Sequence, residues 1–407
     1  MSDLHVTGVR VRAFDARDLP DRPRHPSVQT EDGPTLAGPT GALPDAREHA
    51  AEYGGPVGAV VIEIETDAGV TGMGTAGVPN AGTAAILQHH FAPILIGRDP
   101  FDIERVWETL YRSSLRFGGG GAVMAAIAAV DIALWDVVGK VLGVPVHQLL
   151  GGAVRPSVQV YASKLYATAD LDQLADEARN YLGQGFRMMK QRFGYGPADG
   201  ERGVRANVAL IRTVREVVGD DVELAADAYM GWDLEYAIRM ERELREFRLR
   251  WIEEPLLPWD IGGYVELRRR SRTAISHGEH SFTLADFRSI LDAGAADFVQ
   301  PDANRAGGIT GMRRIFALGR AAGVPMVPHS NELHNLHLVF THLDCPFAEY
   351  FPAEAALDRN SLFWALFRGN PLHENGRLLA PTAAGIGYEL DEDVAERLEV
   401  RLEGIGR

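Results

Sequence analysis

Carboxylate side chains recur at the ends of consecutive apolar runs in the second half of the chain. Asp227, Glu253 and Glu279 end the runs "VELAA", "LRWI" and "AISHG", one residue per run and at equal intervals. Three carboxylates that converge in one cavity repel each other unless a cation joins them. Oxygen ligands alone favour a hard ion, so the trio predicts a Mg²⁺ site. The alternative is that the three side chains point apart and form separate surface pairs.

An acid and a histidine follow on the next two runs. Asp302 comes after "ADFVQP" and His329 after "PMVP". A carboxylate beside an imidazole orients the ring and raises its basicity, which suits a general base. The alternative is a structural histidine held by a backbone group. Glu349, in "FAEYF", is predicted either to present a carboxyl group to a substrate oxygen or to be a structural acid.

Lysine is rare in this chain, and arginine supplies almost all the basic residues. The lysines are Lys140, Lys164 and Lys190. Because lysine carries a compact, titratable ammonium, a role at the site is predicted for Lys164 or Lys190. Lys190 and Arg192 stand two apart in "MKQR", so on a strand they share one face. We expect this pair of cations to meet an anion, with Lys190 facing a substrate carboxylate.

The secondary-structure elements that position these residues can be predicted from the alternation of two sequence patterns. From about Ser157, short β-branched runs alternate with segments of helical spacing such as "LEYAIRMERELREF". Eight such strands alternating with helices predict a parallel α/β barrel. Active sites of this fold lie at the C-terminal ends of the strands, so the residues above are expected to share one rim.

The first part of the chain reads differently. The alternation in "VGAVVIEIETDAGVTGMG" predicts a hairpin of a half-exposed antiparallel sheet, and helical patterns follow it. We expect an α+β unit over 1–143, the barrel over 144–370, and an extension over 371–407 that returns to the first unit. Segment 19–56 is too long for a plain connector and is predicted to be a lid or disordered. Its candidate substrate-binding residues are His25, Arg47 and His49.

Composition narrows the class of protein. The 407 residues are 46% apolar and 24% charged, with a net charge of −15, which disfavours nucleic-acid and anionic-membrane partners. The one cysteine excludes an internal disulfide framework. The start of the chain lacks a signal-peptide pattern, and the apolar stretch "AVMAAIAAVDIALWDVVGKVLG" carries charges typical of a buried helix. A cytoplasmic protein with a small-molecule partner is predicted.

The strand-end motifs resemble the mandelate racemase subgroup of the enolase superfamily, and within it acid-sugar dehydratases of the L-rhamnonate dehydratase type. The matching motifs are "DAYMGW", "WIEEPLLP", "GEH", "QPDANRAGGITG", "VPHS" and "PFAEYF". The resemblance implies a modified (β/α)7β barrel, an N-terminal capping domain whose loop covers the substrate, and a homo-oligomer between dimer and octamer. It also implies one Mg²⁺ at the acidic trio, a His329–Asp302 dyad, and a hydrogen bond from Glu349 to a substrate carboxylate oxygen.

Arg192 discriminates between the activities of this subgroup. Racemases similar to this chain carry a second lysine there, whereas a guanidinium stays protonated and is a poor base. With one base, His329 would remove the α-proton and then protonate the departing 3-hydroxyl, converting an aldonate or aldarate to a 2-keto-3-deoxy acid. The alternatives are a racemase or epimerase that uses Lys164 or Tyr166 as second base, an aldolase with Lys190 as Schiff base, and a non-catalytic sugar-acid binder.

Overall fold

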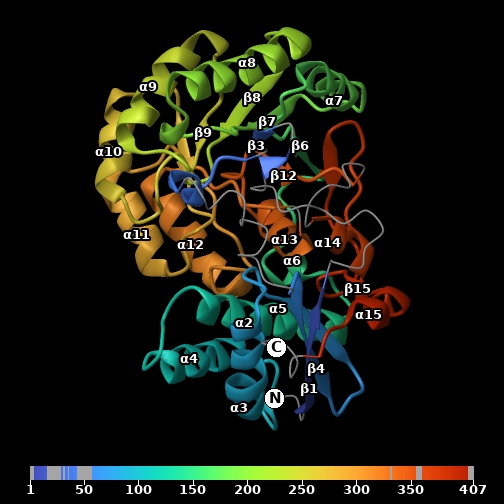
Figure 1. Cartoon of the computed structure of the whole chain (residues 1–407). Helices are drawn as coiled ribbons and strands as arrows, with labels where there is room; N and C mark the ends of the chain where they lie inside the picture. The colour runs from blue at the N-terminus through green and yellow to red at the C-terminus, as the bar shows by residue number, and fades with distance from the viewer. Residues whose placement is uncertain are drawn as a thin grey trace.

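A computed structural model of the chain describes residues 4–15, 29–30, 33–34, 36–43, 57–330, 332–353 and 360–401. A smaller unit of strands and helices lies against the open side of a larger ring of helices around a sheet (Figure 1). The smaller unit contains the antiparallel sheet β1–β4–β5, whose strands are β1 (Val6–Phe14), β4 (Ala59–Thr66) and β5 (Thr71–Thr75). Its helical elements are α2 (Ala81–Ala85), η2 (Ile86–Phe91), α3 (Ala92–Leu95), α4 (Ile103–Ser114) and α5 (Ala122–Leu142). Short elements β2 (Gln29–Thr30), β3 (Gly33–Pro34) and η1 (Pro39–Ala42) precede β4.

The first half of strand β4, residues 59–62, is buried on both faces, so the expected half-exposed sheet is wrong there. In the second half Glu63 is half-buried and Glu65 is exposed, as expected. Val60 and Ile62 pack into the core of the smaller unit, whereas Val61 between them joins the barrel core. The predicted antiparallel pairing is present, because β4 pairs with both β1 and β5. Alternating side chains of a strand face opposite ways, so this burial shows that the smaller unit rests directly on the barrel.

Parallel strands form the barrel, in the order β11-β10-β9-β8-β7-β6-β12. An isolated parallel bridge between Val299 and Met326 marks one further position beyond β11. The predicted α/β barrel with an α+β cap is therefore confirmed. The strands are β6 (Ser157–Ser163), β7 (Met188–Arg192), β8 (Glu223–Asp227), β9 (Ile252–Glu253), β10 (Ile275–His277), β11 (Phe298–Val299) and β12 (Ala348–Tyr350).

Helices cover the outside of this sheet (Figure 1). They are α6 (Val146–Leu149), α7 (Leu171–Gly183), α8 (Gly200–Val218), α9 (Leu234–Leu244), α10 (Ile261–Arg270), α11 (Leu284–Ala293), α12 (Gly308–Ala322) and α13 (Leu333–Thr341), with short turns η3 (Pro197–Asp199) and η4 (Arg245–Phe247). Asp170, Asp233 and Thr283 accept hydrogen bonds from backbone N–H groups at the starts of α7, α9 and α11. Each of these side chains caps the N-terminus of its helix and so fixes the residue at which the helix begins.

Helix α5 is long and apolar enough to cross a membrane by composition, but 89% of its most apolar stretch is buried inside the protein. That burial is typical of a core helix. Its aspartates face inward and serve the fold: Asp136 accepts hydrogen bonds from the Met73 N–H at 2.9 Å and the Ile386 N–H at 2.7 Å. Asp131 accepts one from the Thr310 N–H at 3.0 Å, at the start of α12.

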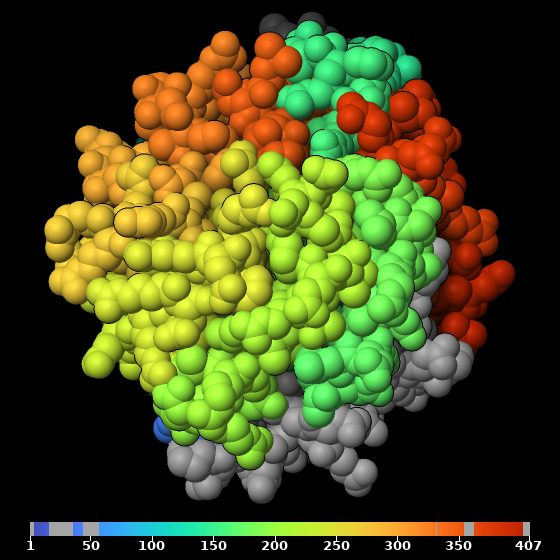
Figure 2. All heavy atoms as spheres, turned by 90° about the horizontal axis from the view of Figure 1, so that it is seen from above, coloured from blue at the N-terminus to red at the C-terminus, as the bar shows by residue number. Residues whose placement is uncertain are grey.

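The C-terminal segment runs back along the barrel to the cap. It contains α14 (Asn360–Leu366), β13 (Phe367–Arg368), β14 (Arg377–Leu379), β15 (Glu389–Leu390) and α15 (Glu392–Leu398). Strand β14 pairs with β6, and Figure 2 shows this red segment lying against the green surface around residues 140–160. Arg12 of β1 is buried and pairs with Glu392 and Glu399 at 2.9 Å each, which ties the segment to the cap.

Candidate active site

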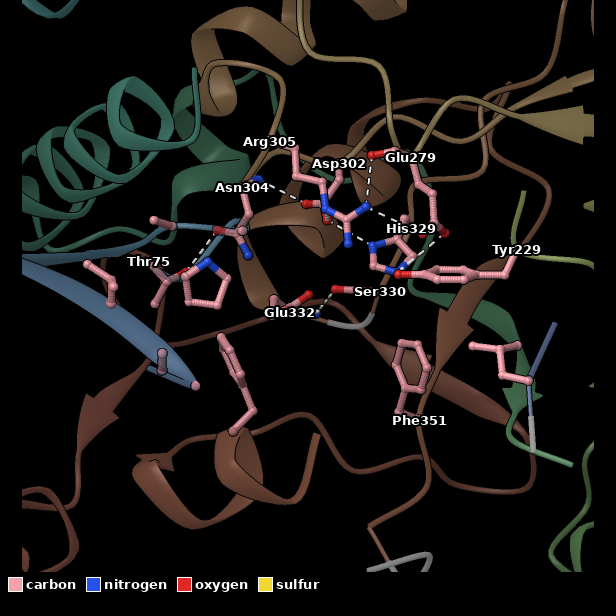
Figure 3. A pocket seen from close by; sticks show the side chains of 18 of the residues that line it. Thr75, Tyr229, Glu279, Asp302, Asn304, Arg305, His329, Ser330, Glu332 and Phe351 are labelled. Carbon is pink, nitrogen blue, oxygen red and sulfur yellow. Dashed lines mark hydrogen bonds and ion pairs between the residues drawn. The ribbon is translucent and has the colours of Figure 1, made fainter. Parts of the chain in front are cut away.

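A cavity of about 220 Å³ lies where the cap meets the C-terminal ends of the barrel strands. The cap contributes one wall through β4 and the end of β5, and the barrel contributes most of the polar groups (Figure 3). Polar and aromatic lining residues are Thr75, Tyr166, Arg192, Tyr229, Glu279, Asp302, Asn304, Arg305, His329, Ser330, Glu332, Phe351 and Phe363. The cavity therefore gathers residues from most of the strand ends.

His329 faces this cavity with Asp302 behind it. Its Nδ1 lies 2.8 Å from Asp302 Oδ2, and its Nε2 lies 3.5 Å from Glu279 Oε2. Burial lowers the pKa of His329 and so does Arg305, but Glu279, Asp302 and Glu349 together raise it to about 9. The carboxylate on Nδ1 orients the ring, so Nε2 is the atom left for proton transfer in the cavity.

Arg305 stands between the same two acids. Its Nη1 lies 3.4 Å from Glu279 Oε1 and donates to the Glu279 backbone carbonyl at 2.9 Å, and its Nε lies 3.5 Å from Asp302 Oδ2. Burial raises the pKa of Glu279, but His329, His280 and Arg305 together lower it well below its usual range. Arg305 thus helps His329 to keep both acids ionised.

Lys190 is fully buried, is surrounded by carboxylates and does not line the cavity. Its Nζ contacts Glu253 Oε1, lies 2.8 Å from Glu349 Oε1 and 3.5 Å from Asp227 Oδ2. Burial lowers its pKa, but these acids raise it far more, so the ammonium stays charged. The cation faces protein acids in this arrangement, and its predicted contact with a substrate carboxylate stays a prediction.

Arg192 reaches the cavity from the other side of the barrel. Arg192 ends β7, whereas His329 follows the bridge at Met326 beyond β11. Strands β8 to β11 lie between these two positions in the order of the sheet. Arg192 Nη1 donates to Asp227 Oδ2 at 2.6 Å and its Nη2 to Ser163 Oγ at 3.2 Å. The guanidinium carbon lies 5.1 Å from the centre of the Tyr166 ring and 5.9 Å from that of Phe351. Burial opposes its charge, but Tyr166 and Asp227 keep its pKa above the ordinary arginine value.

The carboxylates exceed the cations around Glu253, and this excess fits a bound metal ion. Burial raises the pKa of Glu253 to about 8; Lys190 opposes the rise, while Asp227, Glu349 and Glu279 add to it. A buried acid whose pKa is raised by burial and by neighbouring acids is the arrangement that a hard divalent cation would relieve. Asp227, Glu253 and Glu279 thus offer oxygen donors suited to Mg²⁺.

The predicted trio is split between two groups of partners. Lys190 and Arg192 hold Glu253 and Asp227, whereas Glu279 faces His329 and Arg305. Within the described ranges, the group that brings three potential ligand atoms within 4.8 Å of one another is Glu254, Glu279 and His280. Glu254 in turn lies 2.5 Å from His280 Nδ1. Mg²⁺ at the predicted trio would compete with Lys190 for Glu253 and with Arg192 for Asp227.

The remaining predicted residues lie apart from the cavity. Glu349 is buried and accepts from the Ser330 N–H at 2.6 Å; burial raises its pKa, but Lys190 and His329 lower it to about 2, so here it accepts rather than donates. Lys164 is buried near Glu177, and Tyr166 lines the cavity in its place. His25, Arg47 and His49 lie outside the described residues.

Two charged cavity residues, Arg305 and Glu332, were not singled out from the sequence. Arg305 stands three positions after Asp302, so both occupy one turn, and its backbone N–H donates to the Asp302 carbonyl at 3.0 Å. That spacing was a signal that could have found it. Glu332 stands three positions after His329, but a glutamate next to a predicted helix carries no distinctive pattern.

Comparison with known proteins places the chain in a family. Residues 55–151 match the family described as Mandelate racemase / muconate lactonizing enzyme, N-terminal domain, and residues 173–394 match Enolase C-terminal domain-like. The chain belongs to the mandelate racemase / muconate lactonizing enzyme family of the enolase superfamily. The resemblance drawn from the strand-end motifs is confirmed.

Similar proteins within the family include dehydratases and a racemase. An L-rhamnonate dehydratase of Saccharopolyspora erythraea is 37% identical over 368 residues, which are 89% of this chain and 91% of that protein. Rhamnonate dehydratase from Gibberella zeae, solved in complex with Mg, has a TM-score of 0.86 at 25% identity and covers 100% of this chain and 98% of that one. A racemase from Streptomyces coelicolor with bound magnesium has a TM-score of 0.79 at 27% identity and covers 97% and 100%.

Proposed function

We propose that this chain is a Mg²⁺-dependent sugar-acid dehydratase that converts an aldonate or aldarate to a 2-keto-3-deoxy acid. The observation that carries the proposal is the arrangement of cavity bases. His329, backed by Asp302, can exchange a proton, whereas Arg192 across the cavity is pinned to Asp227. A single exchangeable base suits elimination better than inversion, which needs an acid and a base on opposite faces. The dehydratases named among the similar proteins support the same reaction class.

The steps assigned to the chain are proton transfers at His329. Nε2 of the neutral imidazole takes the α-proton of the substrate, and Asp302 stabilises the imidazolium that results. Glu279 is the main group that raises the pKa of His329 to about 9, so a cation bound to Glu279 would favour the neutral imidazole. The imidazolium then gives the same proton to the 3-hydroxyl, which leaves as water as the C2–C3 double bond forms. The enol that remains tautomerises to the 2-keto group. The proton, the hydroxyl and the electron pair of the broken C–H bond are all accounted for without an oxidant.

Asp227, Glu253 and Glu279 would hold the Mg²⁺. When bound, the ion supplies electrostatic stabilisation for the negative charge that develops on the substrate carboxylate. Arg305 and Asp302 keep His329 in place on the adjoining wall. Lys190, released from Glu253 by the metal, would add positive charge near the carboxylate, as the sequence predicts.

A racemase or epimerase is the second candidate, and Tyr166 is the observation that favours it. Its ring lines the cavity beneath the Arg192 guanidinium, and a nearby cation stabilises a phenolate. Tyr166 could then act as the second base that Arg192 cannot provide. The racemase from Streptomyces coelicolor shows that this fold is compatible with such an activity.

The deciding experiment incubates the protein with Mg²⁺ and a panel of aldonic and aldaric acids in D₂O. A 2-keto-3-deoxy acid, with deuterium at C3, is the expected product, and its formation should stop with EDTA and return with added Mg²⁺. Epimer formation or α-deuterium exchange without loss of water would replace the dehydratase by the second candidate. Covalent trapping by borohydride with substrate would instead indicate Schiff-base chemistry at Lys190.

Metal binding can be measured apart from turnover. Adding Mg²⁺ should raise the melting temperature by a few degrees, because binding to the folded state stabilises it. Glu253→Gln should abolish this rise, and Glu201→Gln, an exposed acid of α8, should leave it unchanged. A rise that survives Glu253→Gln would move the metal to Glu254, Glu279 and His280.

A further inference from the structure

Glu332 occupies a position that the fold does not explain. It is the N-cap residue of α13, but its side chain makes no hydrogen bond to the helix, where Ser, Thr, Asp or Asn would cap better. Ser330, two residues before it, has a φ of 73°, in the left-handed region that costs a non-glycine residue free energy. The chain thus turns sharply after His329 and delivers Glu332 to the cavity wall.

The carboxyl group of Glu332 is poorly satisfied there. Its Oε2 is buried and has no hydrogen-bond partner within the described part of the chain. A buried polar oxygen without a partner is unfavourable in a resting protein. Burial and then Asp302 raise its pKa to about 8, against the effect of His329, so at neutral pH the group can both donate and accept. An unpaired group of this kind, facing a cavity, is suited to a ligand hydroxyl.

The position of Glu332 indicates which part of a ligand it meets. In Figure 3, Glu279 and Tyr229 lie on one side of His329, and Glu332 lies on the other, towards Thr75. The Thr75 hydroxyl donates to Asn304 Oδ1 at 2.8 Å, and Phe363 also lines the cavity. A substrate with its carboxylate near the Glu279 side and its α-carbon at His329 therefore extends its remaining carbons past Glu332.

We propose that Glu332 is a specificity-determining residue that hydrogen-bonds to a hydroxyl on the polyol tail of the substrate, beyond the two carbons that react. The inference rests on the proposed sugar-acid dehydration and adds the residue that selects the length and hydroxylation of the tail. Hydrogen-bond recognition of a substrate hydroxyl discriminates strongly, because a substrate without it leaves the buried protein group unpaired. Asn304 and Thr75 complete the polar end of the cavity.

The test compares two probes that differ only in the tail. Six-carbon aldonates carry the full polyol, whereas three-carbon glycerate of matching configuration at C2 keeps the reacting carbons alone. For each, kcat/KM is measured with the Mg²⁺-loaded protein. In the unchanged protein the six-carbon acid should be preferred. Glu332→Ala should cut this preference about ten- to hundred-fold by lowering kcat/KM for the six-carbon acid only.

Two further variants make the result specific. Glu332→Gln, whose amide also donates and accepts, should keep most of the preference, whereas Glu332→Asp, one methylene shorter, should lose much of it. Glu201→Gln, an exposed glutamate in the first turn of α8, should match the unchanged protein. An equal loss on both probes would make Glu332 a support for His329, and an unaltered preference in Glu332→Ala would remove it from the substrate site.

Failure of this inference is distinguishable from failure of the proposed function. A protein that dehydrates the six-carbon acid while Glu332→Ala leaves the preference intact overturns the inference alone. A protein that dehydrates neither probe overturns the proposed reaction. In that case the affinity of the Mg²⁺-loaded protein for the two acids, by calorimetry, still decides the role of Glu332: an unaltered affinity ratio in Glu332→Ala refutes it.

Discussion

The two walls of the cavity differ in what their charged groups can do. One wall holds His329 among Asp302, Glu279 and Arg305, where the imidazole can change its protonation state. The other holds Arg192, fixed to Asp227 and Ser163 and stacked near Tyr166. A guanidinium keeps its proton at any working pH, so this wall supplies a permanent field. The difference teaches that proton transfer and charge stabilisation are separated in space.

Removing the exchangeable group should have the largest effect. His329→Asn keeps a polar side chain of similar reach but cannot cycle a proton, so kcat should fall by about 10³-fold or more. Substrate affinity, measured by calorimetry with Mg²⁺, should change much less. Full activity in this variant would mean that the base lies on the other wall.

Replacing Arg192 by a residue that can exchange a proton should make the two walls of the cavity more alike. Arg192→Lys retains a cation near Asp227 but introduces an amine that can lose its proton. The rate of dehydration should fall about tenfold, because the lysine ammonium cannot reproduce both hydrogen bonds that Arg192 donates to Asp227 and Ser163. Epimer formation, followed by NMR in D₂O, should appear or increase. Arg192→Gln, which has no exchangeable base, serves as the control and should lose dehydration without gaining epimer.

The Tyr166 hydroxyl offers a smaller test of the same wall. Tyr166→Phe keeps the ring beneath Arg192 and removes the hydroxyl. A one-base dehydratase should lose less than about threefold in kcat/KM, because no proton passes through that group. A loss of a hundredfold or more would assign Tyr166 to proton transfer and favour the second candidate function.

A buried histidine away from the cavity, His277, contrasts with His329 in how it responds to pH. It should affect the pH dependence of folding stability. His277 ends β10, is fully buried and stacks on Tyr264 at 3.8 Å; burial lowers its pKa to about 3. The unfolded chain binds a proton near pH 6.5 that the folded one does not, so stability falls as pH drops below 6.5. The loss from this residue is about 2 kcal/mol between pH 6.5 and 5.

His277→Phe, which keeps an aromatic stack, should remove that part of the pH dependence. Urea unfolding at pH 7 and pH 5 measures it, with His90→Phe, a partly exposed histidine of the cap, as control. An unaltered difference between the two pH values would show that His277 is charged in the folded protein or protonates with the others.

The class of fold and the residues at its rim could be predicted because both depend on local periodicity. A β-branched run followed by a helical segment sets where each strand ends, and Asp227, Glu253, Glu279, Asp302 and His329 all stand at such ends. Parallel strands place their C-terminal ends on one rim, so the residues had to gather. The burial of residues 59–62 of β4 on both faces was missed because it depends on the barrel beneath them.

Pairing within the rim was decided by the tertiary structure. Lys190 reaches Glu349 at 2.8 Å across 159 positions of sequence, and Arg305 stands between Glu279 and Asp302. Glu332 meets the cavity only because Ser330 turns the chain and the cap closes the opposite wall. The sequence by itself determined which chemical groups stand at the strand ends, through spacing. Which of them share a proton, a cation or a ligand was determined by distances of a few ångströms between remote segments, because electrostatic and hydrogen-bond energies depend on those distances.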